Sequence, residues 1–419
     1  MSIKSARAVL IALCLMISLA SSLPGCAWKD HEMAPPLEGE PIVIGIPLPL
    51  TGSKAAFGEI KRNAYEMAAE EINAAGGIDG RLLSLSFRDT AGEPDSAASV
   101  AEALISVDGV TFLAGEYSSA CALAVAGVAQ RHKIPYLIDS AAADSITQQK
   151  WDYVFRLNPP ANLFAQGLTA WFGEVVKPRS MVIVYEHSDF GSSVAKAMRD
   201  WCRRAGVRVP VYEGYEPGTL DFTPIISKAK DASPDVVYMV SYLMDASLIV
   251  RQARAQGLRP KVFAGGAAGF VLPEFITNAG DATENVVTAA LWAPSLGYPG
   301  AHEFAETYRA RFGDYPTYHA AESYSCVYVI ADVIRRAAST HPDRIRVALA
   351  DTELMTVFGP VKFEEFEKYR NQNRMNTLVL QIIGGKHEVV WPPEFATAAY
   401  VYPDPASLAE TAEPADTGR

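Results

Sequence analysis

Val110-Thr-Phe-Leu-Ala-Gly-Glu-Tyr-Ser-Ser119, followed by an alanine-rich run to Arg131, is the most informative part of this 419-residue sequence. Apolar residues end at Gly115 and two hydroxyl side chains follow, which predicts a buried strand leading into a helix over 120–131. The start of a helix presents free N–H groups and the positive end of the helix dipole, so a site for an anion is expected beside Ser118 and Ser119. An ordinary helix cap without a ligand is the alternative.

Strand-like and helix-like segments alternate on both sides of this junction. Predicted strands cover 42–48, 82–87, 110–114, 135–138, 181–185, 207–213, 236–240 and 262–265, and predicted helices cover 59–75, 96–106, 120–131, 160–176, 192–205, 223–230, 244–256, 300–312, 320–339 and 343–351. Repeated strand–helix units with apolar strands indicate a parallel sheet covered by helices on both faces. Because the pattern restarts after Phe155-Arg156, we predict an α/β fold of two similar lobes with a ligand cleft between them.

The two ends of the sequence differ from this pattern. Lys4 and Arg7 precede the uncharged run 8–20, and Leu23-Pro-Gly-Cys26 follows, which resembles a bacterial lipobox. We therefore expect a lipoprotein signal peptide over 1–25, lipidation at Cys26 and a tether over 26–41, with plain secretory cleavage, or no cleavage, as the alternatives. The composition after Pro393 predicts a disordered tail over 394–419.

Charge and cysteine content exclude several classes of protein. The net charge of -11 becomes more negative by two when residues 1–25 are removed, so nucleic acid is not expected as a partner. Cys121, Cys202 and Cys326 have no metal or redox spacing. They are interpreted as buried free thiols, with one disulfide as the alternative.

Catalytic sites find little support in the sequence. Ser118, His187 and Asp189 could be imagined as a triad, but no Gly-x-Ser-x-Gly elbow surrounds the serines. Neither His-Glu-x-x-His nor Cys-x-x-Cys is present. We predict a protein that is not an enzyme and that uses no metal and no cofactor.

The order of several short segments resembles the branched-chain amino-acid (Leu/Ile/Val) type of periplasmic solute-binding protein, the receptor of an ABC importer. The segments that carry the resemblance are Gly45–Gly52, Glu71–Gly80, Asp89 with Pro94, Gly115–Ser119, Phe155-Arg156, Asp189-Phe-Gly191, Asp221-Phe222, Arg251–Gly257, Gly359–Phe363 and Val390-Trp-Pro392. The resemblance implies three crossings between lobes, near residues 158, 288 and 359, and ligand capture by hinge closure.

The implied lobes are 42–158 with 289–359, and 159–288 with 360–393. The implied partners are a small solute (an amino acid, carboxylate or amide), an ABC permease and ATPase complex, and the membrane through the lipid anchor, at the periplasm or cell surface. A ligand sensor of the same fold, coupled to a signalling protein, is the alternative role.

The resemblance also implies a set of site residues. The ligand-binding set is Phe57, Tyr117, Ser118, Ser119, Ser140, Ala141, Ala142, Asp189, Phe190, Tyr242 and Gly266. Two positions depart from the family pattern, because Ala142 replaces a threonine and Gly266 replaces an acidic residue that pairs with the ligand ammonium. The expected pocket binds an anion at one end and has aromatic walls. Asp139, Asp189, Asp245 or Glu116 would supply a replacement charge if the solute is an amino acid.

Overall fold

The computed structural model of the chain describes residues 39–408. The predicted signal peptide, Cys26 and residues 27–38 of the predicted tether lie outside these residues, as do residues 409–419. Within the described part, no helix is both long enough and apolar enough to cross a membrane.

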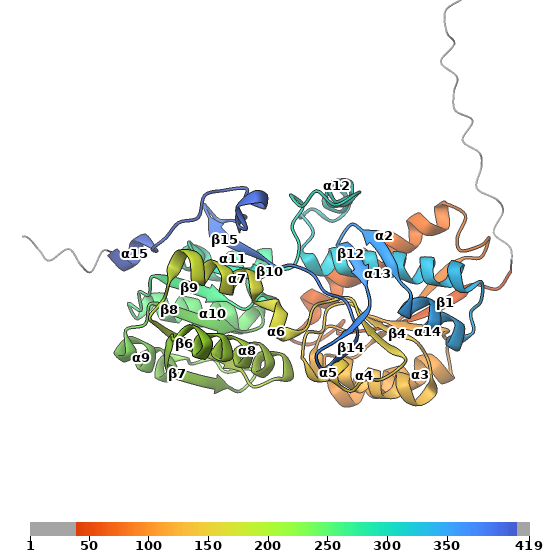
Figure 1. The fold of residues 1–419 in the computed structure, drawn as a ribbon, viewed down its shortest axis with the longest axis horizontal. Coiled ribbons are helices and arrows are strands. Elements are labelled where there is room, and N and C mark those ends of the chain that lie inside the picture. The colour runs from red at the N-terminus through yellow and green to blue at the C-terminus, as the bar shows by residue number, and fades with distance from the viewer. Residues whose placement is uncertain (1–38, 409–419) are drawn as a thin grey trace, which may run out of the picture. The chain divides into compact units, whose positions relative to one another are not determined.

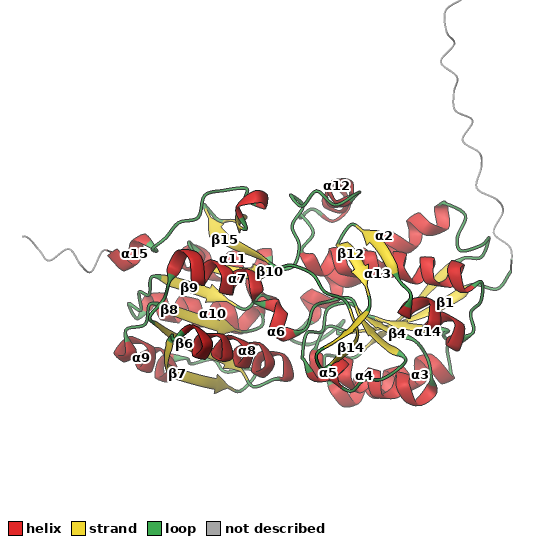
Figure 2. Ribbon diagram, viewed as in Figure 1, coloured by secondary structure: helices red, strands yellow, loops and turns green. Residues whose placement is uncertain are grey.

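Two seven-stranded sheets form the framework of the fold (Figures 1 and 2). In the first sheet the strand order is β13-β14-β5-β4-β3-β1-β2, and in the second it is β16-β15-β10-β9-β8-β6-β7. The first sheet comprises β1 (Ile42–Leu48), β2 (Leu83–Asp89), β3 (Phe112–Ala114), β4 (Tyr136–Ile138), β5 (Val154–Arg156), β13 (Glu364–Phe366) and β14 (Tyr369–Gln372). The second comprises β6 (Ser180–Glu186), β7 (Arg208–Tyr215), β8 (Val236–Val240), β9 (Val262–Gly265), β10 (Val287–Ala290), β15 (Leu378–Ile383) and β16 (Lys386–Trp391).

Most neighbouring strands are parallel, as predicted, and the late strands β13, β15 and β16 are antiparallel to their neighbours. A separate hairpin joins β11 (Glu353–Thr356) to β12 (Gly359–Lys362). The two-lobe α/β prediction is confirmed.

Helices cover both faces of each sheet. The first lobe carries α2 (Ala55–Ala74), α3 (Pro94–Ser106), α4 (Ser119–His132), α5 (Ser145–Gln148), α12 (Ala301–Phe312), α13 (Tyr318–Ala337) and α14 (Pro342–Ala350). The second carries α6 (Ala161–Phe164), α7 (Gln166–Trp171), the π-helix η1 (Phe172–Val176), α8 (Asp189–Ala205), α9 (Thr223–Ala232), α10 (Leu243–Ala255), η2 (Ala268–Val271), α11 (Pro273–Ala279), η3 (Gly280–Thr283), η4 (Pro393–Phe395) and α15 (Pro405–Leu408).

The alternation of side chains along β3 explains why the first sheet needs helices on both faces. Phe112 and Ala114 pack in the same apolar core as α2 and α13, whereas Leu113 packs with α3 and α4 on the other face. Successive residues of a strand point to opposite faces. All three residues are fully buried, so neither face of this strand contacts water.

The chain passes between the sheets after Arg156, after Ala290 and after Gln372. The first two crossings lie close to the predicted positions, but the third lies over 373–377 and not near 359. Residues 360–372, which the sequence analysis assigned to the second lobe, supply β12 of the hairpin and β13 and β14 of the first sheet (Figure 1). Two of the three residues of β13 are glutamates, so it has no apolar pattern to mark it.

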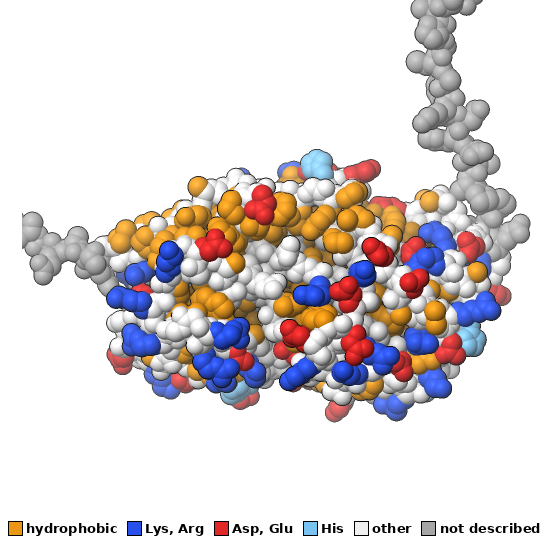
Figure 3. Space-filling model, viewed as in Figure 1, with side chains coloured by type: hydrophobic (Ala, Val, Ile, Leu, Met, Phe, Trp, Pro, Cys, Tyr) orange, Lys and Arg blue, Asp and Glu red, His pale blue; other side chains and the backbone are white. Residues whose placement is uncertain are grey.

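The predicted disordered tail is wrong for residues 394–408. Asp404 is buried and pairs with Arg254 at 2.8 Å, and the Tyr402 hydroxyl donates to the carbonyl of Val176. This segment is rich in Ala and Pro, which suggested disorder, but its contacts with the second lobe hold it in place. Figure 3 shows acidic and basic side chains interspersed on the face that it draws, with apolar side chains gathered along its upper edge.

Candidate functional site

The serine turn connects β3 to α4, as the sequence predicted. Gly115 has a φ of +101°, which favours glycine, and lets the chain leave the sheet. Ser118 is the N-cap of α4, and its hydroxyl accepts a hydrogen bond from the Cys121 N–H at 3.3 Å. Ser119 begins the helix, so both hydroxyls lie at the carboxyl end of β3.

Glu116 already fills part of the expected anion site. Its fully buried carboxylate accepts hydrogen bonds from the N–H groups of Tyr117 and Ser118 and from the Thr90 hydroxyl at 2.5 Å. Burial raises the pKa of this carboxyl group. A side chain of the turn itself therefore binds the two N–H groups that precede α4.

Ser119 joins the turn to the loop that follows β4. Its hydroxyl accepts a hydrogen bond from the Ala143 N–H at 3.1 Å. The same loop is held from the other side by the fully buried Arg156, whose guanidinium donates to the carbonyls of Ala141 and Ala143 at 3.1 and 2.7 Å. Ala142 lies between them and is buried. The hydroxyl proton of Ser119 is not used in the bond to Ala143, so it can be donated to a solute.

Ser140 belongs to a buried charged cluster formed by Lys61, Asp139, Ser140 and Glu322. The Lys61 ammonium lies 2.6 Å from the Asp139 carboxylate and donates to the Ser140 hydroxyl at 2.7 Å. Ser140 in turn bonds to Glu322. The Ser140 hydroxyl thus accepts from Lys61 and donates to Glu322. Neither of these two partners was predicted from the sequence.

Burial shifts the pKa of two groups at this cluster, Glu322 and His319. Desolvation raises the pKa of Glu322 well above its usual value and lowers that of the neighbouring His319. Asp139 accepts further hydrogen bonds from the hydroxyls of Tyr65 and Ser323, both at 2.7 Å. Lys61 and Asp139 form the ion pair of the cluster, and hydrogen bonds with neighbouring hydroxyls accompany their burial.

Aromatic side chains from both lobes meet in front of the serine turn. Phe57 stacks on Tyr117, with ring centroids 4.1 Å apart and an interplanar angle of 11°. Tyr242 of the second lobe lies 5.7 Å from Tyr117 and 5.8 Å from Phe190, again between ring centroids. His319 lies 5.2 Å from Phe57. Four residues predicted from separate parts of the sequence therefore form one group.

An acidic pair lies on the second-lobe side of this group, and sequence reasoning missed one of its members. Glu186 ends β6, Asp245 lies in the first turn of α10, and the two carboxyl groups share a hydrogen bond. Burial, followed by the interaction with Asp245, raises the pKa of Glu186 to about 7. Glu186 stands three residues before Asp189, at the carboxyl end of a predicted strand, and that position was the available signal. Asp189 itself is exposed in the first turn of α8.

The Lys54 ammonium approaches from the first lobe, 5.0 Å from the centroid of the Tyr242 ring. Its charge acts on both carboxyl groups of the pair. The acidic pair, the aromatic group and a cation thus lie at the boundary between the lobes.

Gly266 explains why the acidic group is not where the family pattern places it. A Cβ atom at this position would lie 2.7 Å from the Tyr238 hydroxyl oxygen and 3.2 Å from side-chain atoms of Val194 and Val240. Side chains of Tyr238, Val194 and Val240 occupy the space beside Gly266, so an acidic side chain at this position requires them to move. Among the described residues, no group of three or more His, Cys, Asp or Glu is arranged to hold a metal ion.

Comparison with known proteins agrees with this geometry. The sequence profile of the family described as periplasmic binding protein matches residues 41–386. Leu/Ile/Val-binding protein homolog 8 of Brucella abortus is 30% identical over 409 residues, covering 93% of this chain and 97% of the relative. The chain is a periplasmic binding protein of the branched-chain amino-acid type.

Solved structures resemble this binding protein over most of its length. The branched-chain amino acid transporter substrate binding protein LivJ of Streptococcus pneumoniae, in complex with isoleucine, has a TM-score of 0.77 and 25% identity, covering 84% of this chain and 100% of that one. A solute binding protein of an ABC transporter from Rhodopseudomonas palustris, in complex with 3,4-dihydroxybenzoic acid, has a TM-score of 0.74 and 19% identity, covering 83% and 94%. Proteins of this fold are thus found with an amino acid and with an aromatic acid.

Proposed function

We propose that this binding protein is the extracytoplasmic receptor of an ABC importer and captures an amino acid or a related small carboxylate or amide between its lobes. One observation carries the proposal: the ring of Tyr117, in the serine turn of the first lobe, lies against Tyr242 of the second lobe, which in turn packs on Phe190. A solute held there contacts both lobes, so its binding favours the closed arrangement. The names of the relatives support the importer role.

The chemistry of the two sides supports a solute with distinct ends. The hydroxyls of Ser118 and Ser119 and the N-terminus of α4 favour a carboxylate or carbonyl oxygen. The Glu186–Asp245 pair favours an amine, because a cation next to two buried carboxyl groups stabilises their ionised forms. Phe57 and Phe190 favour an apolar body. An amino acid with an aliphatic or aromatic side chain meets all three requirements.

The proposed location of the receptor at the membrane rests on the lipobox-like sequence at Cys26. The proposed lipid at Cys26 would hold the protein at the membrane, where the proposed permease and ATPase reside. Growth in radiolabelled palmitate tests this point, with Cys26→Ser as the variant that should lose the label.

Thermal unfolding tests the proposed function. The mature chain carrying Cys26→Ser is heated with L-leucine, L-isoleucine, L-phenylalanine, the matching acids without an amine, benzoate and isovaleramide. A solute at 100 times its dissociation constant stabilises the fold by about 2.7 kcal/mol. We expect the amino acids to raise the melting temperature most. If none of these solutes shifts unfolding, the proposed solute class is wrong; if the amine-free acids do better, the role given to Glu186 and Asp245 is wrong.

A further inference from the structure

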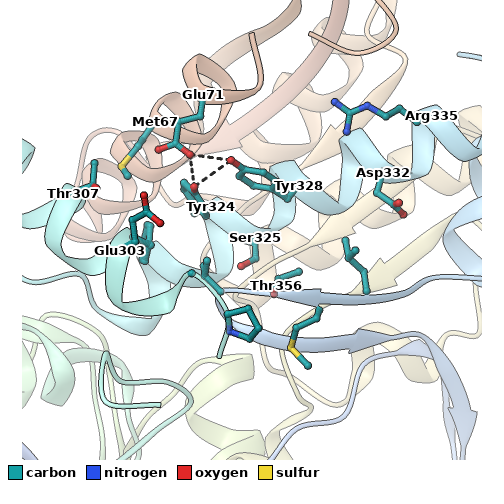
Figure 4. A pocket seen from close by; sticks show the side chains of 16 residues that line it. Met67, Glu71, Glu303, Thr307, Tyr324, Ser325, Tyr328, Asp332, Arg335 and Thr356 are labelled. Carbon is teal, nitrogen blue, oxygen red and sulfur yellow. Dashed lines mark hydrogen bonds between the residues drawn. The ribbon is translucent and has the colours of Figure 1, made fainter. Parts of the chain in front are cut away.

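The first lobe contains a cavity that is separate from the aromatic group between the lobes. It has a volume of about 560 Å³ and lies between α2, α12, α13 and the strand β11 (Figure 4). Its lining residues come from α2, α12 and α13, from the chain leading into α12, and from β11 with the turn that follows it. Cavities of this size commonly hold small organic molecules.

One wall of the cavity is apolar and aromatic. The ring of Tyr324 packs against Phe304 and Tyr328, with centroids 4.6 and 5.0 Å apart. Met67 and Leu354 complete this wall. Such a surface binds an apolar or aromatic body and attracts a cation toward its ring faces.

The polar groups of the cavity are mainly acidic. The Glu71 carboxylate accepts hydrogen bonds from the hydroxyls of Tyr324 and Tyr328, the latter at 2.9 Å, and Figure 4 shows the three groups converging. Glu303 faces them from α12. Within residues 39–408, neither Glu71 nor Glu303 lies within 4 Å of a basic side chain as an ion pair.

The other charged residues that line the cavity do not pair with Glu71 or Glu303. Asp332 pairs with Arg336 at 2.7 Å, and Arg335 donates to the carbonyl of Gly77 at 3.0 Å. The lining therefore carries three carboxylates and one guanidinium. An anion is disfavoured there, and the acidic residues are not arranged as a metal site in the described part of the chain.

We propose that this cavity binds a small organic cation with an apolar or aromatic body, whose ammonium group lies at Glu71 and Glu303 and whose body packs on Tyr324 and Phe304. This site is additional to the one between the lobes and does not depend on it. Two phenol hydroxyls fix the orientation of the Glu71 carboxylate, so the anionic group is already placed for a cation before binding.

Calorimetric titration of the mature chain carrying Cys26→Ser tests the proposal, with 2-phenylethylammonium as the probe. Two further compounds, 2-phenylethanol and 3-phenylpropionate, have the same ring with no charge and with the opposite charge. We expect the ammonium compound to bind with 1:1 stoichiometry and at least tenfold more tightly than the other two. Equal binding of all three, or no heat of binding for the ammonium compound, overturns the proposal.

Amino-acid substitutions test whether the ammonium compound binds in this cavity or between the lobes. Glu71→Gln keeps an acceptor for both tyrosine hydroxyls and should weaken the ammonium compound at least tenfold, as should the surface change Glu303→Gln. Glu59→Gln makes the same charge change on the exposed face of α2 and should have no effect. If Tyr242→Ala abolishes binding while Glu71→Gln does not, the compound binds between the lobes and this proposal fails, whereas the proposed function stands.

Discussion

Glu116 shows how a single residue changes what a site offers. Because its carboxylate binds the N–H groups of Tyr117 and Ser118, the donors that remain at this turn are the serine hydroxyls and the N-terminus of α4. The residues of the turn were predicted, but no pattern in the sequence shows that a side chain folds back on its own backbone.

Replacing Ser119 tests the importance of its hydroxyl. Ser119→Ala should weaken binding of a carboxylate solute by about 1–3 kcal/mol, because a buried hydrogen bond is lost. Titration of the solute found by the thermal panel measures this effect. Ser99→Ala, an exposed serine on α3, is the matched control and should leave affinity unchanged. Unchanged affinity in Ser119→Ala would remove this contact from the proposed site.

Gly266 and Tyr238 provide a test of packing. Gly266→Ala should lower the free energy of unfolding by about 1–3 kcal/mol, since the new methyl group overlaps the Tyr238 hydroxyl. Tyr238→Phe removes that oxygen, which has no hydrogen-bond partner among the described residues, and should restore part of the loss in the double variant. Gly173→Ala, where a Cβ atom meets nothing within 4 Å, is the control for urea unfolding. Strictly additive losses would contradict the overlap.

The acidic pair predicts a dependence on pH. The pKa of Glu186 is about 7 in the folded protein and 4.5 without these neighbours. The folded state therefore keeps a proton that the unfolded state loses, so the free energy of unfolding falls as the pH rises from about 4.5 to 7. In Glu186→Gln this fall should be smaller, as measured by urea unfolding at pH 5 and pH 7.5. Glu174→Gln, an exposed change in the same lobe, should keep the slope of the wild-type protein; equal slopes in all three would contradict the burial argument.

At the scale of elements, apolar strands were the most predictable feature. The observed bounds of β1, β8 and β9 are those predicted, because each is a short run of mainly apolar residues. The helix predicted over 160–176 is instead divided into α6, α7 and η1. Gly167, at this division, donates its N–H to the Thr377 hydroxyl at 2.6 Å. That partner is 210 residues away, so local sequence carries no sign of the break.

Amino-acid composition wrongly predicted disorder for residues 394–408, and truncation tests how much this segment contributes to the stability of the fold. Removing residues 393–419 leaves the largely buried Arg254 without Asp404 and should lower the free energy of unfolding by about 3 kcal/mol or more. Removing only residues 409–419 keeps every contact described for this segment and serves as the control. Equal unfolding midpoints in urea for the two truncated chains would show that the segment adds nothing.

At the scale of the whole molecule, the site is assembled from distant parts of the chain. Ser140 bonds to Glu322 across 182 residues, and Lys61 of α2 joins them. Predicting the site therefore required the family resemblance to bring these regions together. The resemblance named four aromatic residues that lie together in the structure, but it could not supply Glu186 or the charged cluster, which depend on this chain's own side chains.

The connection between the lobes gives a prediction at the same scale. Gln372 accepts a hydrogen bond from the fully buried Arg156 at 2.7 Å and donates to the carbonyl of Asn158 at 2.7 Å. Gln372→Leu should lower the free energy of unfolding by about 3 kcal/mol, because it removes a partner from a buried charge. Gln372→Glu keeps an acceptor for Arg156 and should cost less in the same urea measurement. A larger loss in the glutamate variant would contradict this assignment.

The position of β14 beside β5 has a consequence for the order of events during synthesis. The ribosome completes Arg156 long before Gln372, which lies 216 residues further on, and β15 follows later still. A nascent chain therefore carries two unfinished sheets, each with an unpaired edge, until almost all of it has been made. Delay of this kind keeps the polypeptide in a state that a translocation channel can thread, and it leaves prematurely terminated chains with open edges that proteases and chaperones recognise.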